Sequence, residues 1–163
     1  MEYTKWKTDV AYIELVKDLL EAPSVQELEK YVQHHATTRL NHSISVSHRS
    51  YRIAKFFNWH EKEVARAGLL HDLFYHDWRE TKFIEGTHAY AHPYIAYQNA
   101  LKITDLNELE KDIIVKHMWL STLSPPRFKE SFLVSAVDKY CAVVEYFSGL
   151  KERWSKRLSS RSN

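Results

Sequence analysis

The stretch of residues 67–74 constrains the fold of this chain more than any other part of it. It is almost wholly apolar, and near its end it carries an adjacent imidazole and carboxylate, His71 and Asp72. Val64, Ala67 and His71 fall on one stripe of a helix, so the pattern predicts that the stretch is helical. A helix that is apolar on most of its sides belongs inside a core, where an unpaired charge is very costly. His71 and Asp72 therefore need buried partners, and a metal ion is one such partner.

Apolar periodicity predicts helices along the rest of the chain, and the sequence shows no strand-like alternation. Ser24 and Glu27 form the pattern of a capping box that would open the second helix. The expected helices cover residues 6–20, 24–35, 42–57, 59–74, 88 or 93 to 101, 104 or later to 119, and 128–147. Residues 75–87 are expected to form a loop, and 150–163 a frayed tail. The prediction is an all-α bundle with one domain over residues 1–163, in which residues 1–41 pack on a core of about 42–147.

The composition narrows the class of protein. A net charge of +2 over 163 residues is too small to suggest a nucleic-acid or membrane surface, and no apolar run approaches the ~18 residues of a membrane span. The single cysteine, Cys141, fits a reducing compartment and is interpreted as a packed, inert thiol. We therefore expect a soluble, cytoplasmic protein without a specific nucleic-acid partner. Ten histidines are the anomaly, and histidine is the commonest metal ligand among side chains.

Polar groups recur on the apolar faces of the predicted helices. The set consists of His42, His71, Asp72, His92, His117 and Asp138. A hydrogen-bonded core histidine or a solvated aspartate explains any one of them, taken alone, better than a metal ligand does. Their order on successive helices favours a metal site, because such sites in helix bundles are built from side chains on facing helices.

The same residues resemble the HD-domain superfamily of metal-dependent phosphohydrolases. The resemblance covers about residues 42–147, and its specific part is the Leu-Leu-His-Asp core that ends at Asp72. The details look like those of small bacterial HD-domain hydrolases without an assigned substrate. Their Asp-Trp-Arg, His-Pro, Lys-His-Met-Trp and Val-Asp-Lys-Tyr-Cys-Ala motifs stand here in the same order, from Asp77, His92, Lys116 and Val137. No Gly-Tyr-Pro follows His117, so cyclic-dinucleotide phosphodiesterase activity is not implied.

The resemblance implies a role for each ligand. His42, His71, Asp72 and Asp138 would hold a first metal, and Asp72 would bridge to a second metal that His92 and His117 also bind. Mononuclear members lack the two intermediate histidines, so the resemblance implies two divalent ions. Nitrogen and oxygen ligands suit iron, manganese, cobalt, nickel or zinc.

Two of these ligand assignments have alternatives. His48 competes with His42, which is favoured because it stands 29 residues before His71 and is followed by a Val in the family's manner. His88 competes with His92, since residues i and i+4 share a helix face, and the following Pro93 favours His92.

The resemblance also implies phosphate-ester hydrolysis by a metal-bound hydroxide, with two ions clamping the phosphoryl group. Asp72 is then catalytic as the bridging carboxylate, and His88 would face the substrate or support a ligand. Arg79 is the leading candidate for binding phosphate, because a guanidinium matches phosphate geometry, and Lys139 directly follows Asp138. Weaker candidates are Arg127 and Lys129 for phosphate, His76 and Asp77 for proton transfer, and Trp78 and Trp119 for a base or sugar pocket.

Three functions fit this ligand set. The first is a standalone phosphomonoesterase or phosphodiesterase acting on a nucleotide or another small phosphorylated metabolite. The sequence leaves open whether this enzyme forms a homodimer. The second is an oxygenase, because some HD-fold proteins use a dinuclear His/Asp site for diiron oxygen chemistry. The third is a non-catalytic regulatory module that binds metal.

Overall fold

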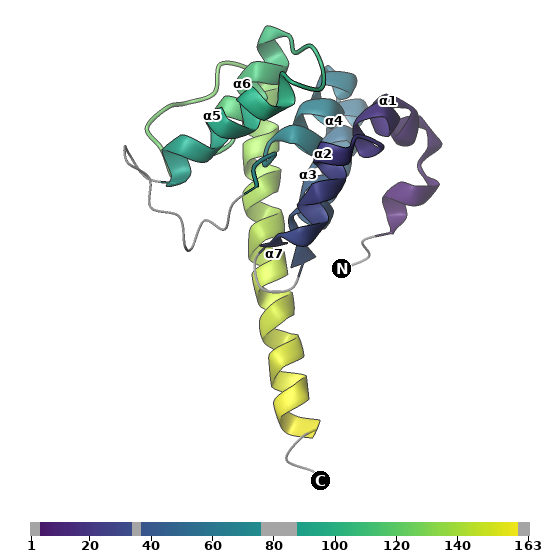
Figure 1. The fold of residues 1–163 in the computed structure, drawn as a ribbon, viewed down its shortest axis with the longest axis vertical. Coiled ribbons are helices and arrows are strands. Elements are labelled where there is room, and N and C mark those ends of the chain that lie inside the picture. Colours follow the sequence, from purple (N-terminus) through teal and green to yellow (C-terminus); the bar gives the residue numbers. More distant parts are fainter. Residues whose placement is uncertain (1–3, 34–36, 76–87, 160–163) are drawn as a thin grey trace.

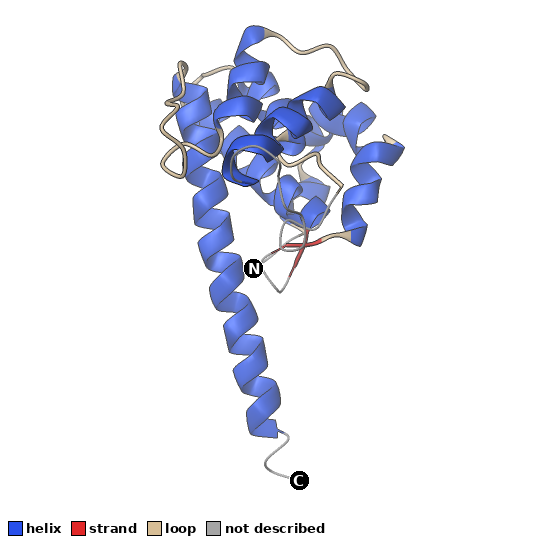
Figure 2. Cartoon of the chain, turned by 60° about the vertical axis from the view of Figure 1, so that its left-hand side comes forward, coloured by secondary structure: helices blue, strands red, loops and turns tan. Residues whose placement is uncertain are grey.

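The computed structural model of the chain describes residues 4–33, 37–75 and 88–159. This part is mostly helical (Figures 1 and 2), which confirms the predicted all-α class. The helices are α1 (Val10–Leu20), α2 (Pro23–Gln26), α3 (Arg39–Phe56), α4 (Glu61–Leu70), α5 (His88–Ala100), α6 (Glu108–Lys116) and α7 (Lys129–Ser159). In the described ranges, no helix is long and apolar enough to cross a membrane.

The N-terminal region departs most from the prediction. Lys5–Thr8 is a separate 3₁₀ turn, because Asp9 interrupts the helix and its carboxylate caps α1 by accepting the Tyr12 N–H. The helix expected over residues 24–35 is wrong. Pro23 starts α2 one residue early, with Ala22 as its N-cap, so the predicted capping box does not form. A 3₁₀ turn, Glu27–Lys30, follows directly.

A two-stranded antiparallel sheet, also missed by the prediction, connects this region to α3. Strand β1 (Val32–Gln33) pairs with β2 (Thr37–Thr38), so that Gln33 lies opposite Thr37. The Thr38 hydroxyl then accepts the Asn41 N–H and starts α3 at Arg39, three residues before the predicted start. The sheet holds Gln33 at 7% exposure, next to the site described below.

Helix α4 is the centre of the fold, as expected of so apolar a stretch. It lies against α1, α3, α5, α6 and α7. Its approach to α3 is close, because a Cβ on Gly68 would meet the Ser47 Cα at 3.1 Å. The facing side of α3 presents the small, buried side chains of Ser43, Ser47 and Ser50. This packing brings the start of α3 and the end of α4 together.

Helices α4, α5 and α6 set the local backbone of three histidines. α4 ends at Leu70, four residues before the predicted end, and His71 is its C-cap. α5 begins at His88, the earlier of the two predicted starts. α6 begins after a capping box between Asn107 and Glu110 and ends before His117, short of the predicted end at residue 119.

Helix α7 is far longer than predicted. It has 31 residues, which corresponds to about 46 Å, and it extends well beyond the body of the molecule (Figures 1 and 2). The expected end near Phe147 is wrong, because the helix continues through Gly149, whose cost in a helix is only about 1 kcal/mol. Residues 150–159 of the expected frayed tail are therefore helical. The first half of α7 packs against α3, α4 and α6.

Candidate metal centre

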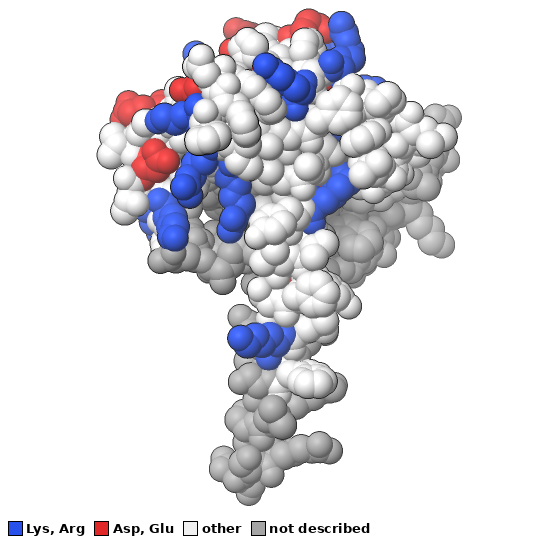
Figure 3. All heavy atoms as spheres, turned by 180° about the vertical axis from the view of Figure 1, so that it is seen from behind, with Lys and Arg blue, Asp and Glu red and all other residues white. Residues whose placement is uncertain are grey.

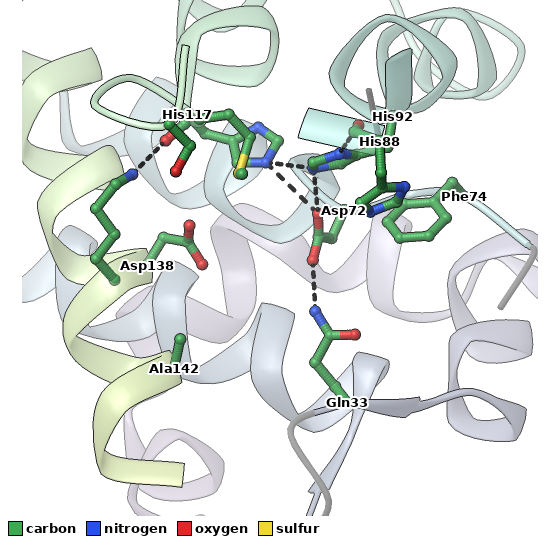
Figure 4. A pocket seen from close by; sticks show the side chains of 11 residues that line it. Gln33, Asp72, Phe74, His88, His92, His117, Asp138 and Ala142 are labelled. Carbon is green, nitrogen blue, oxygen red and sulfur yellow. Dashed lines mark hydrogen bonds and ion pairs between the residues drawn. The ribbon is translucent and has the colours of Figure 1, made fainter. Parts of the chain in front are cut away.

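Five helices bring the six predicted metal ligands into one buried cluster. His42 comes from α3, His92 from α5 and Asp138 from α7, while the others follow the ends of α4 and α6. All six side chains belong to residues at most 8% exposed. Figure 4 shows His92, His117 and Asp72 pointing toward one another, with Asp138 on the facing helix.

Three of the histidines donate their Nδ1–H to a backbone carbonyl. His71, His92 and His117 donate to the carbonyl oxygens of Gly68, His88 and Ile114, at 2.8, 2.7 and 2.7 Å respectively. Because a carbonyl can only accept, each ring carries a proton on Nδ1, and in its neutral form it leaves a lone pair on Nε2. This is the tautomer of a histidine that binds a metal through Nε2.

Two of these lone pairs face each other. The Nε2 atoms of His92 and His117 lie 2.9 Å apart, and when both rings are neutral with the proton on Nδ1, neither nitrogen can donate to the other. The Oδ1 atom of Asp72 lies 3.4 and 3.6 Å from the two nitrogens and adds a third electron-rich atom. Three such atoms at this spacing need a cation between them. The donor set therefore fits a metal ion.

A second group of donors adjoins the first. His42 Nε2 lies 2.9 Å from Asp138 Oδ1, and His71 Nε2 lies 3.6 Å from the same oxygen. His71 Nε2 is also 3.8 Å from Asp72 Oδ2 and has no hydrogen-bond partner among the described residues. Donor atoms of His42, His71 and Asp138 lie within 4.8 Å of one another, as do those of His71, Asp72 and His117. Each of these groups could hold a metal ion.

Neighbouring charges set the protonation of the cluster. Burial disfavours ionisation of both carboxyl groups, but the surrounding histidines outweigh it and hold the pKa values of Asp72 and Asp138 well below the usual range. Burial, followed by the charges of His92 and His71, lowers the pKa of His117 to about 3. A charged carboxylate and a neutral imidazole are the forms that bind metal.

His42 differs, because it lies between two carboxylates. Its Nδ1 is 3.0 Å from the Oε2 atom of Glu145, which is fully buried. Burial lowers the pKa of His42, but the hydrogen bonds to Asp138 and Glu145 outweigh burial and raise it to about 10. The sequence analysis missed Glu145. A signal was present, since Glu145 stands seven residues after Asp138 and so lies on the same face of the helix.

Gln33 also supports the cluster and was also missed. Its Nε2 donates to Asp72 Oδ2 at 3.0 Å. The buried Arg39 lies against the other end of the amide, with Nε 3.5 Å from Gln33 Oε1, and donates from Nη1 to the Phe74 carbonyl at 2.6 Å. Arg39 therefore orients the Gln33 amide, and the amide orients Asp72. No local signal marked Gln33, because it was assigned to a helix that does not form.

A pocket of about 290 Å³ opens onto the cluster (Figure 4). Its lining consists of Gln33, Asp72, Phe74, His88, His92, His117, Met118, Ser121, Asp138, Lys139 and Ala142.

Besides Asp72, two predicted catalytic residues, Lys139 and His88, lie in the wall of this pocket. Lys139 Nζ donates to the His117 carbonyl at 2.9 Å and to Ser135 Oγ at 3.0 Å, and burial lowers its pKa. The ring of His88 stacks on that of His92, with centroids 4.3 Å apart.

Four of the other candidates lie outside the pocket lining. His48 Nε2 bonds to Asp9 Oδ2 at 3.1 Å, so the structure places His42 in the cluster and His48 outside it. Three weaker candidates, Trp119, Arg127 and Lys129, are absent from the pocket lining. His76, Asp77, Trp78 and Arg79 lie outside the described residues.

The free thiol of Cys141 is buried on α7, between Asp138 and Glu145. Burial raises its pKa to about 12. This agrees with the expectation of a packed, inert thiol.

Comparison with models of known protein families, with curated proteins and with solved structures finds no match for this chain.

Proposed function

We propose that the chain is a metal-dependent phosphohydrolase of the HD type, acting on a nucleotide or another small phosphorylated metabolite. One observation carries the proposal. Two groups of imidazole and carboxylate donors share His71 beneath a pocket whose wall includes a lysine. The motif order from His42 to Asp138 adds the resemblance to HD-domain hydrolases.

The residues divide between two ions. His42, His71 and Asp138 would hold one ion, and His92 and His117 the other. Asp72 would serve both, since its Oδ2 faces His71 and its Oδ1 faces His92 and His117. Two bound divalent ions would activate a water molecule and polarise the phosphoryl group. Without a thiolate in either group, the donors suit iron, manganese, cobalt, nickel or zinc.

The pocket suits a small anionic substrate. Its volume of about 290 Å³ is at the lower end of the range for small-molecule sites, roughly 300–1,000 Å³. The ammonium of Lys139 would attract a phosphate, while its bonds to the His117 carbonyl and Ser135 keep it in the wall. Phe74, Met118 and Ala142 offer apolar contacts for the rest of the substrate.

The test begins with protein purified without chelator. We expect about two ions per chain by elemental analysis, and phosphate release from at least one member of a panel of nucleotides and sugar phosphates. His71→Ala should lose nearly all activity and most of the metal, because His71 belongs to both groups. His48→Ala is the matched control, since it removes a buried histidine that lies outside the cluster.

Three results would contradict the proposal. Wild-type metal content in His71→Ala would show that the site is wrong. Oxygen uptake without phosphate release, together with the electron paramagnetic resonance signal of a mixed-valent diiron centre, would identify the alternative oxygenase. A wild-type protein that takes up no metal on reconstitution would exclude both enzymes.

A further inference from the structure

Helix α7 presents two opposite faces. Asp138, Cys141 and Glu145 point inward and are buried. The outward face carries large apolar side chains that remain exposed. One stripe of them consists of Tyr140 at 56%, Val143 at 54%, Phe147 at 63%, Leu150 at 39% and Trp154 at 72%, while Phe132 at 38% and Tyr146 at 48% are exposed beside this stripe. Ala136, also exposed, precedes Tyr140 in the stripe. The six residues of the stripe are called the α7 seam below.

The spacing of the α7 seam is that of a coiled coil. From Ala136 to Trp154 the steps are four, three, four, three and four residues. An apolar residue at every first and fourth place of a heptad makes a narrow seam, which packs against another helix by inserting knobs into holes. A helix that lies on a membrane needs a wider apolar face than this. The partner indicated by the spacing is therefore a helix.

Nothing in the described part of the chain provides that helix. The second half of α7 extends beyond the body (Figures 1 and 2), and where the side chains of the upper part of this projection are described, Figure 3 shows mostly uncharged residues. A helical segment of this length is marginal in water without packing. The part of α7 that extends from the body is thus a helix with an unfilled apolar seam.

We propose that the α7 seam binds the α7 seam of a second copy of the chain and forms a two-fold dimer. A two-fold interface uses the same patch on both subunits, which suits a seam that repeats along one helix. The seam's aromatic residues bury about 150–250 Å² each when fully covered, and they are half exposed or more. The exposed part of the seam is thus about 500 Å² per copy, and two copies bring about 1,000 Å² together, which is the lower bound for a specific interface.

The rival partner is an anionic membrane surface. Residues 151–161 include five cationic side chains and a single acidic one, and basic residues beside Trp and Phe are typical of interfacial helices. The narrow heptad spacing favours the second copy. The experiment below separates the two.

The experiment measures the mass of the full chain by sedimentation equilibrium over about 1–100 µM. We expect the wild type to form a dimer, and Phe147→Glu to raise the dissociation constant by about 100-fold or more, because it places two like charges in the seam. Phe147→Leu should remain dimeric. Phe56→Glu is the matched control, since it makes the same change at a site on α3 that is 82% exposed. Metal content should be unchanged in every variant, because the seam faces away from the cluster, and circular dichroism should change by no more than the fraying of the projecting end of α7 in a variant that no longer dimerises.

Each other result overturns the proposal. A wild type that stays monomeric at 100 µM has no such interface. A dimer that Phe147→Glu and a second variant, Val143→Glu, leave intact uses another surface. A monomer that binds vesicles containing phosphatidylserine, and loses this binding in Phe147→Glu, uses the seam for a membrane.

Discussion

The two halves of the buried cluster are built from the same residue types but balance their charges differently. In the first half, His42 lies between the carboxylates of Asp138 and Glu145, at 2.9 and 3.0 Å. A proton on His42 satisfies both of them. In the second half, His92 and His117 turn lone pairs toward each other at 2.9 Å, and Asp72 adds a further oxygen. Here a proton on His117 is disfavoured, since its pKa is lowered to about 3.

This difference shows how one cluster can discriminate between its two ions. An ion entering the first half must displace the proton of His42, which offsets part of its binding free energy. An ion entering the second half relieves repulsion that already exists. We therefore expect the second half to bind its ion more tightly than the first half at neutral pH.

The largest effect is expected from replacing one histidine in each half. His117→Gln and His42→Gln keep a polar side chain but remove an imidazole, so each should lower the metal content from about two ions per chain to one. Activity should fall by more than about 100-fold, because even outer partners of metal ligands contribute about 10–100-fold. The ion kept by His42→Gln should bind more tightly than the ion kept by His117→Gln, as measured by calorimetric titration. The opposite order would refute the asymmetry.

The second effect concerns the carboxylate behind His42. Glu145→Gln preserves the shape and removes one buried charge, so the hydrogen bond that orients His42 loses its charged acceptor. The affinity of the first half should fall by about 10–100-fold, while the second half keeps its ion. Metal titrations of Glu145→Gln and of His117→Gln distinguish the two halves, because His117→Gln should retain only the ion site of the first half. Equal loss of both ions in Glu145→Gln would mean that Glu145 supports the fold rather than one site.

The parts of the fold and of the metal centre that could be predicted from the sequence are those determined by residues close together in the chain. Neighbouring residues set the start of α6 after Asn107 and the start of α2 at Pro23. For α2, the capping-box pattern at Ser24 predicted a start one residue too late. The six ligands were predicted from their order along the chain. The spacing of Glu145 from Asp138 indicates a shared helix face, but Glu145 and Gln33 act on residues 103 and 39 positions away, and no pattern within one helix identifies those partners. The two-stranded sheet was missed for a different reason, because strands of two residues leave no alternation to detect.

A smaller effect is expected at Gln33. Gln33→Leu removes the amide that donates to Asp72 Oδ2, so Asp72 loses its orientation but keeps its charge. Because Asp72 serves both halves, the affinity for both ions should fall, by about 10-fold. Gln33→Asn keeps the amide on a shorter side chain, so its affinity for the ions should lie between that of Gln33→Leu and that of the wild type. Loss of one ion alone would show that Asp72 does not bridge the two halves.

The smallest effect is expected at Cys141. This thiol is not one of the proposed metal ligands, but its rate of labelling indicates how tightly the first half is packed. The thiol is buried between Asp138 and Glu145 on α7, and burial raises its pKa to about 12. Because the thiolate is the reactive form, maleimide should label Cys141 slowly in the native protein and rapidly in denaturant. If the proton on His42 already balances the first half, removing the ions should change the native labelling rate only slightly. A large increase on chelation would show instead that the ion, not the proton, holds α7 against α3.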